Sequence, residues 1–380
     1  MQHVSHFLGA MACGLILVAG CQGFQPRPIL EQELLRDLQT IQLETLRSPA
    51  PADHPNAAAP PPAFDPTDGL SSDEAVAVAL FLNPALRTFR RERGVAEGEL
   101  IAAGLLPNPE FQLTWLHIEH FTQSLATSGF DLGLNWAPPR PGELGAKQAR
   151  AQARINEVRA LIASEEWRLA ADVRKAHAAV LAAEERLRLA EASLRLQERI
   201  RQFIRDKRQL GDASNLDVNL VDLEYAQALR ERETVTTQRD RARLELNRLL
   251  GLPPRSETKL ETAGDPLAYK PVLVDPAALE STLLAHRPDL LAAKEEYEQV
   301  EQSLRLAYLQ RWPWFRFGPA YSRDEIEGKA GNRWGLGLGV DLPLANFNQG
   351  EIARLEATRE QVRQGFVARL HQARAEGNDA

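Results

Sequence analysis

The stretch WGLGLGVDL, from Trp334 to Leu342, decides the fold class of this 380-residue chain. Its large apolar side chains fall at every second position, and glycine or aspartate stands between them. Successive side chains of a β-strand point to opposite faces of the sheet, so this spacing predicts a strand with one apolar face and one small, polar face. Such a strand suits a membrane wall that has lipid on one side and water on the other.

The same alternation occurs in the first half of the chain, in FDLGLNW from Phe130 to Trp136. Each of these strands has an apolar partner upstream, and the four expected strands are 109–119, 128–137, 313–322 and 333–342. A soluble sandwich is the alternative, but four strands are too few for one. The residues expected to face lipid are Phe130, Leu132, Leu134, Leu336, Leu338 and Val340, and those expected to face water are Asp131 and Asp341.

An internal duplication relates the two halves of the chain at an offset of 204 residues. At this offset apolar residues, prolines and glycines coincide in order: Leu86 with Leu290, Pro109 with Pro313, and Gly133 with Gly337. We therefore expect two repeats with the order helix, strand, strand, helix. The expected division is a first repeat over 70–251, a linker over 252–274 and a second repeat over 275–380.

The hydrophobic period changes from 2 to about 3.5 after Gly145, which predicts a long coiled-coil hairpin over 145–250. One helix from Lys147 to Gln209 would be roughly 95 Å long at 1.5 Å per residue. Gly211 can end this helix, and Ser214 with Asp217 forms a plausible capping box for the next. The seam of the first helix consists of Val173, Ala176, Val180, Ala183, Leu187, Ala190 and Leu194.

The N-terminus reads as a signal peptide over 1–20, because its apolar run is too short for a membrane-spanning helix. The residues Val18, Ala19, Gly20 and Cys21 resemble a bacterial lipobox. This resemblance implies cleavage before Cys21 and attachment of diacylglycerol and palmitate there. Residues 21–69 then form a lipid-anchored tether that is rich in proline and alanine and cannot fold alone.

Several function classes are disfavoured by the sequence. A net charge of −7 argues against nucleic acid as a partner. The chain has no glycine-rich phosphate loop, no metal-binding Cys/His spacing and no GxSxG motif, so we expect neither an enzyme nor a cofactor. His117 and His120 are three residues apart and would point to opposite faces of a strand, so we interpret them as loop residues and not as a metal pair.

Four motifs carry a resemblance to the TolC family of outer-membrane efflux channels, which covers about Leu70 to Arg374. They are EAVAVALFLNPAL (Glu74 to Leu86), AGLLPNPEF (Ala103 to Phe111), HRPDLLAA (His286 to Ala293) and VDLPLANFNQGEIARLEA (Val340 to Ala357). The residues of the second and fourth motifs are most similar to those of the heavy-metal efflux branch of that family.

The resemblance implies a mostly α-helical fold with a small transmembrane β part. It also implies a homotrimer in the outer membrane, in which strands from three chains close a barrel and helices form a periplasmic tunnel. The chain would be a passive export duct for small solutes or metal ions, working with a periplasmic membrane-fusion adaptor and an inner-membrane pump. The implied adaptor contact is the hairpin tip, which consists of Leu210, Gly211, Asp212, Ala213, Ser214, Asn215, Leu216 and Asp217.

The second repeat is shorter than the first. The first repeat continues for 106 residues from Gly145 to Gly251, whereas the sequence ends 30 residues after Gly350. We therefore expect a truncated helix over 350–376 and an incomplete second hairpin. This length difference favours an alternative function, that of a lipid-anchored periplasmic coiled-coil scaffold that does not conduct.

Overall fold

The computed structural model describes residues 24–39, 69–118, 127–261, 285–326 and 329–379. The expected signal peptide, the lipobox residues Val18, Ala19 and Gly20, and Cys21 lie outside the described residues, as do most of the tether and part of the linker. The described elements are α2 (Glu31–Gln39), α3 (Ser72–Leu82), α4 (Pro84–Gly104), β1 (Glu110–Ile118), β2 (Thr127–Asn135), α5 (Glu143–Gln209), α6 (Asn215–Leu250), α8 (Pro288–Leu309), β3 (Trp314–Ile326), β4 (Lys329–Asp341) and α9 (Gln349–Asp379).

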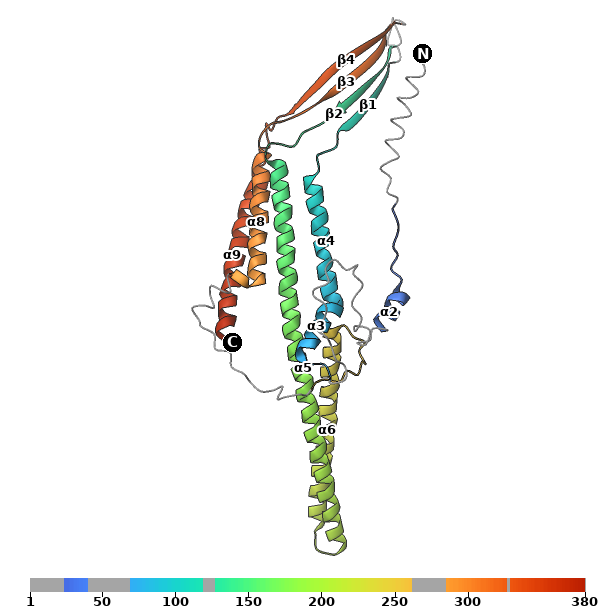
Figure 1. The fold of residues 1–380 in the computed structure, drawn as a ribbon, viewed down its shortest axis with the longest axis vertical. Helices are drawn as coiled ribbons and strands as arrows, with labels where there is room; N and C mark the ends of the chain where they lie inside the picture. Colours follow the sequence, from blue (N-terminus) through green and yellow to red (C-terminus); the bar gives the residue numbers. More distant parts are fainter. Residues whose placement is uncertain (1–23, 40–68, 119–126, 262–284, 327–328, 380) are drawn as a thin grey trace.

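The chain is elongated, with a small sheet at one end, a body of long helices below it and a projecting hairpin at the other end (Figure 1). The expected mostly helical fold with a small β part is confirmed. The order helix, strand, strand, helix occurs twice, as α4-β1-β2-α5 and as α8-β3-β4-α9. All strands pair antiparallel in one four-stranded sheet in the order β1-β2-β3-β4, so the two repeats join through β2 and β3.

The second strand pair is longer than the sequence predicts. Strands expected over 313–322 and 333–342 extend to Ile326 and back to Lys329. Most of the added residues are polar, as in Arg323, which pairs with Asn332. The alternation of apolar residues stops at this point, but the antiparallel ladder continues because backbone pairing does not require apolar side chains.

Helix α5 is the spine of the molecule. Its 67 residues make it about 100 Å long at 1.5 Å per residue. Helices α4 and α8 pack along the half near the sheet, and α6 packs along the half that leads to the tip (Figure 1). Helix α9 packs against α8, where the Tyr308 hydroxyl donates to Glu356 at 2.8 Å.

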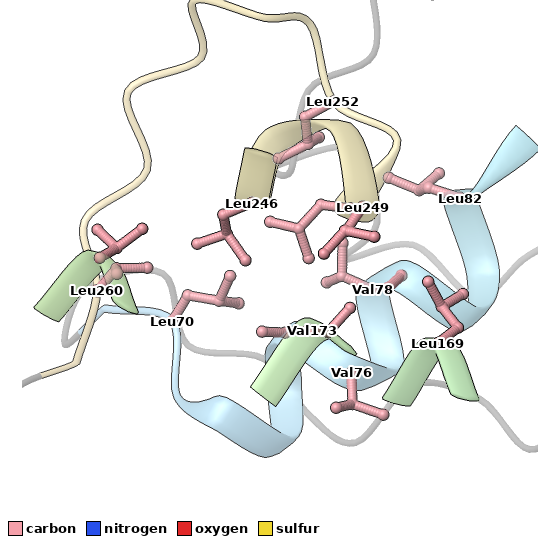
Figure 2. Packing of buried hydrophobic residues seen from close by; sticks show 14 of the residues in the cluster. Leu70, Val76, Val78, Leu82, Leu169, Val173, Leu246, Leu249, Leu252 and Leu260 are labelled. Atoms are coloured by element: carbon pink, nitrogen blue, oxygen red, sulfur yellow. The ribbon is translucent and has the colours of Figure 1, made fainter. Parts of the chain in front are cut away.

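The main core lies where α3 docks onto α5 and α6 (Figure 2). Leu70, Val173 and Leu250 are completely buried there, and Leu246 is nearly so. Leu70 also pairs with Leu260 in a short parallel bridge, and its carbonyl oxygen lies 2.9 Å from Nε2 of the buried His177. The core therefore ties the segment before α3 and the segment after α6 to the spine.

The break between α3 and α4 lies at Asn83, directly before Pro84, because proline has no N–H to continue the hydrogen bonds of α3. The Asn83 side chain accepts a hydrogen bond from the Leu86 N–H at 3.0 Å and donates one to the Leu249 carbonyl at 2.8 Å. It therefore caps α4 and also satisfies a carbonyl at the end of α6. Gly251 ends α6 with φ of 75°, and a Cβ there would lie 2.8 Å from the Leu82 carbonyl oxygen, so the same junction requires glycine.

Candidate functional site

The first candidate surface is the apolar face of the sheet. Cross-strand partners share a face, and the register aligns Leu132 with Tyr321 and Tyr321 with Trp334. The same register aligns Phe317 with Leu338. All six residues predicted to face lipid lie on this one face: Phe130, Leu132, Leu134, Leu336, Leu338 and Val340.

The apolar face spans all four strands and is exposed in the single chain. Leu336 is 76% exposed and Leu338 is 71% exposed, although both are large aliphatic residues. Aromatic rings pack against one another on this face. The ring centroids are 4.5 Å apart for Tyr321 and Trp334 and 5.9 Å apart for Phe130 and Tyr321. Such pairs stabilise a sheet beyond their buried area. A continuous apolar surface of this kind needs an apolar environment.

The opposite face is small, polar and hollowed. Its floor is made of residues with little or no side chain, and the register sets them side by side across β2, β3 and β4: Gly133, Gly318, Ala320, Gly335 and Gly337. The backbones of neighbouring strands approach most closely at Gly318, where a Cβ would lie 1.4 Å from the Leu134 carbonyl oxygen. Asp131 and Asp341, the residues expected on the water side, lie on this face.

An ion pair crosses the polar face near the helical body. Nη2 of Arg316 donates to Oδ1 of Asp341 at 2.6 Å. The Arg316 side chain passes over Gly339, where a Cβ would lie 3.0 Å from its Cγ. The sequence alone does not predict this pair, because only the register of β3 against β4 brings the two residues together.

Two tryptophans form hydrogen bonds with the short segments that connect the sheet to the helices. The Trp136 indole N–H donates to the Pro107 carbonyl at 2.9 Å, and the Trp314 indole N–H donates to the Pro138 carbonyl at 2.5 Å. The Arg140 guanidinium lies 5.3 Å from the centre of the Trp314 ring. Amphipathic rings at the end of a transmembrane sheet are typical of a membrane–water interface.

The second candidate surface is the tip between α5 and α6. Gly211 has φ of 91°, and the N–H groups of Gly211 and Asp212 donate to the carbonyls of Arg208 and Lys207. This Schellman motif ends α5. Ser214 and Asp217 form the predicted capping box, in which each side chain accepts from the other's backbone N–H. The hydrogen bond from the Ser214 hydroxyl lowers the pKa of the Asp217 carboxyl.

The hairpin near the tip is held by polar contacts. Asp222 on α6 accepts from Nε of Arg201 at 2.6 Å and from Nη2 of Arg205 at 3.0 Å. These hydrogen bonds, Arg201 first, hold the pKa of Asp222 below its usual value. The Arg201 guanidinium also lies 4.5 Å from the centre of the Tyr225 ring. Large apolar residues on the same stretch of α5 point outward and are exposed: Leu189, Leu196 and Phe203.

The described residues offer no metal centre, since no group of three or more His, Cys, Asp or Glu residues among them could hold an ion. Nor is any helix in the described part of the chain long and apolar enough to cross a membrane. His117 belongs to strand β1 and not to a loop, which corrects the sequence interpretation. Its companion His120 lies outside the described residues.

Known proteins resemble this chain in sequence and in fold. Residues 77–252 match the family described as outer membrane efflux protein. The cobalt-zinc-cadmium resistance protein CzcC of Cupriavidus metallidurans is 25% identical over 287 residues. The match covers 74% of this chain and 65% of CzcC, so it spans less than two thirds of that relative's length.

Solved structures of channels share the fold at lower identity. A crystal structure of CusC, described in connection with transmembrane channel formation, has a TM-score of 0.65 at 17% identity and covers 82% of this chain and 76% of CusC. The Campylobacter jejuni outer membrane channel CmeC has a TM-score of 0.63 at 11% identity and covers 92% of this chain and 76% of CmeC. At identities this low, the similarity shows that the fold is shared. The function has to be argued from the two candidate surfaces.

Proposed function

We propose that this chain, whose residues 77–252 match the outer membrane efflux protein family, is the outer-membrane duct of a tripartite efflux system. In this proposal it exports small solutes or metal ions passively, and it performs no enzymatic reaction. Three copies contribute their sheets to one barrel, and a periplasmic adaptor and an inner-membrane pump deliver the solute.

The observation that carries the proposal is the division of the sheet into two faces. Every large side chain of the alternating pattern lies on one exposed face, and the other face is a hollow floor of glycine with polar groups around it. Contact with lipid suits the apolar face, and contact with water suits the polar face. Phe130, Leu132, Leu134, Leu336, Leu338 and Val340 would then face lipid.

The hairpin tip supports the proposed adaptor contact. Helix α5 carries the tip about 100 Å away from the sheet, so the tip projects far into the periplasm. The contact residues would be Leu210 to Asp217, where Leu210 is 79% exposed and Leu216 is 66% exposed. Gly211 has no side chain, so a second hairpin tip can approach the backbone closely there. A cysteine at Ala213 should cross-link to a co-expressed adaptor.

A lipid anchor at Cys21 remains part of the proposal. One acyl chain alone gives reversible membrane binding, whereas several give firm attachment. Mass spectrometry of the mature N-terminus should find acyl groups on Cys21. An uncleaved signal sequence or an unmodified Cys21 would exclude this anchor.

Divalent metal ions are the solutes we favour. The support is the similarity to CzcC, which is named for resistance to cobalt, zinc and cadmium. Expression together with the adaptor and pump, in a strain that lacks its own channel, should raise tolerance to these ions. Unchanged tolerance, beside a working channel as control, would count against metal export.

Insertion into membranes tests the duct itself. Leu338→Arg places a charge on the apolar face, at a cost of about 2–4 kcal/mol at mid-bilayer. Gly337→Ser is the matched control, because its new Cβ meets only the Gly318 carbonyl oxygen at 3.6 Å on the polar face. We expect Leu338→Arg to lose insertion and Gly337→Ser to retain it. Equal tolerance of both substitutions would reject the duct and favour the periplasmic scaffold.

A further inference from the structure

The segments that connect the sheet to the helices differ in composition from the rest of the chain. We call them the collar, and they are 105–109 (LLPNP), 136–142 (WAPPRPG), 310–313 (QRWP) and 342–348 (LPLANFN). The collar contains no aspartate and no glutamate, although 26% of the chain is charged. Its only charged residues are Arg140 and Arg311. It lies between the strands and the helical body (Figure 1), which is the level at which a membrane around the sheet would end.

The collar exposes large apolar side chains. Leu344 is 81% exposed and Trp312 is 71% exposed. Four more apolar residues are exposed, and they are Leu105, Leu106, Leu342 and Phe347. Leu342 and Leu344 continue the two-residue spacing of the apolar face beyond Val340, the last apolar residue of β4. The apolar surface therefore does not stop where the sheet ends.

Two hydrogen bonds attach the segment 342–348 to the end of α8. Nδ2 of Asn348 donates to the Ala307 carbonyl at 2.9 Å and to Oε1 of Gln310 at 3.3 Å. Asn348 has φ of 58°, a left-handed conformation in which asparagine is several-fold enriched. Gln310 is followed directly by Arg311 and Trp312. This attachment therefore joins two segments of the collar, 310–313 and 342–348, into one surface.

Arg311 supplies a positive charge that no described residue neutralises. It is exposed, and its guanidinium lies 5.9 Å from the centre of the Tyr308 ring, without an ion pair to any described residue. Arg140 is held closer to the protein, with Nη1 3.8 Å from Oε2 of Glu143 and the guanidinium beside the Trp314 ring. Arg311 is therefore the cation of the collar that can reach a partner.

The carboxylates next to the collar do not offset this charge. Three of them already have a cationic partner: Asp341 pairs with Arg316, Glu143 with Lys147, and Glu351 with Arg354. Glu110 lies on the polar face of the sheet, away from the apolar residues. The collar thus presents apolar side chains beside an arginine whose charge is not compensated.

From this arrangement we infer that the collar binds the inner leaflet of the outer membrane, with its apolar side chains among the lipid headgroups and Arg311 on a lipid phosphate. The inference rests on the proposed function, because the collar reaches this leaflet only if the sheet spans the membrane. Tryptophan is enriched at membrane–water interfaces, and arginine forms strong hydrogen bonds with phosphate. A second copy of the chain fits the collar less well, since a symmetric ring would bring a collar of the same positive charge to the same height.

Quenching of a fluorescent probe by labelled lipids tests the inference. The full chain, with Cys13 and Cys21 replaced by alanine, carries the probe on one introduced cysteine in vesicles of phosphatidylethanolamine and phosphatidylglycerol. The quencher is placed either at the lipid headgroup or on the acyl chain. We expect headgroup quenching at Leu344→Cys and acyl-chain quenching at Leu338→Cys, which is the positive control on the sheet. Val367→Cys is the matched negative control, because Val367 is apolar and 52% exposed but lies about 27 Å along α9 from its start.

The same probe at residue 344 tests the charge of Arg311. One arginine near an anionic lipid surface should favour the lipid-bound collar about fivefold. Arg311→Gln should therefore lower the ratio of quenched to unquenched probe by about that factor. Arg91→Gln is the control, because Arg91 is exposed and also forms no ion pair with a described residue, but lies about 20 Å along α4 from its end. We expect Arg91→Gln to leave the ratio unchanged.

The remaining outcomes separate this inference from the proposed function. A quenched probe at Leu338 beside an unquenched probe at Leu344 would overturn the inference and leave the duct intact. So would a disulfide between two copies through Leu344→Cys, because a second copy would then cover the collar. Equal quenching with and without Arg311→Gln would overturn the phosphate contact. A chain whose probe is quenched at neither Leu338 nor Leu344 would overturn the proposed function, and the inference with it.

Discussion

The two ends of the α5–α6 hairpin are built in opposite ways. At its base, apolar side chains point inward, and Val173, Val180 and Leu246 are buried between the helices and α3. Toward the tip the side chains between the two helices are only partly buried, and ion pairs from Asp222 to Arg201 and Arg205 join the helices there. Two leucines of that stretch, Leu189 and Leu196, are exposed at 56% and 49%.

This difference separates the base, which a single chain can stabilise by itself, from the tip half, whose exposed apolar side chains are available to a neighbouring chain. Burial of apolar area stabilises the base within one chain. Leu189, Leu196 and Phe203 follow one another at intervals of seven residues and form an outward row on α5. A heptad row on the outside of a helix pair is suited to a third helix. In the proposed trimer, that helix belongs to the next copy.

The largest expected effect is at the base. Leu246→Ala removes a side chain that is 3% exposed, and such truncations cost about 2–5 kcal/mol. Thermal unfolding followed by circular dichroism should show a clear fall in the midpoint. Leu244→Ala, on the same helix at 47% exposure, is the matched control and should change the midpoint little. Equal shifts would mean that the base is not the stabilising core.

The outward row should respond to a different measurement. Leu196→Ser should leave the unfolding of a single chain nearly unchanged, because surface substitutions usually stay within about 0.5 kcal/mol. It should weaken trimer association by up to about 1.5–3 kcal/mol per buried leucine. Analytical ultracentrifugation in detergent separates the two effects. Destabilised monomers with unaltered association would contradict the division between base and tip.

A smaller effect is expected at the tip itself. Ser214→Ala removes the cap of α6, which typically costs about 1 kcal/mol. Hydrogen exchange of the first-turn amides of α6 should become faster, while amides at the base keep their rates. Ser193→Ala, at an exposed position inside α5 and away from its ends, provides the control. Unchanged exchange at the tip would show that the capping box does not stabilise this turn.

The sequence predicts these features unequally, for physical reasons. Side-chain alternation and helix-ending residues are local, so the apolar face, the Asn83-Pro84 break and the Ser214–Asp217 box can all be read from short stretches. The pairs Arg316–Asp341 and Arg201–Asp222 join residues that are 25 and 21 positions apart. Only strand register and helix packing bring them together. The pairing of β2 with β3 is equally non-local.

The smallest expected effect is the response of the tip to pH. Hydrogen bonds from Arg201 and Arg205 lower the pKa of Asp222, and the Ser214 hydroxyl and backbone N–H lower that of Asp217. An aspartate whose pKa is lower in the folded chain stabilises the fold above its unfolded pKa of about 3.9. That stabilisation is lost as the pH falls through the lower folded value. Relative to the base, and after correction for intrinsic exchange rates, tip amides should therefore lose protection as the pH falls below about 4. The dependence should weaken in Asp222→Asn, whose amide does not titrate. A parallel loss at tip and base would mean that the carboxylates act on the whole fold, and the hairpin would then not divide into two independently held ends.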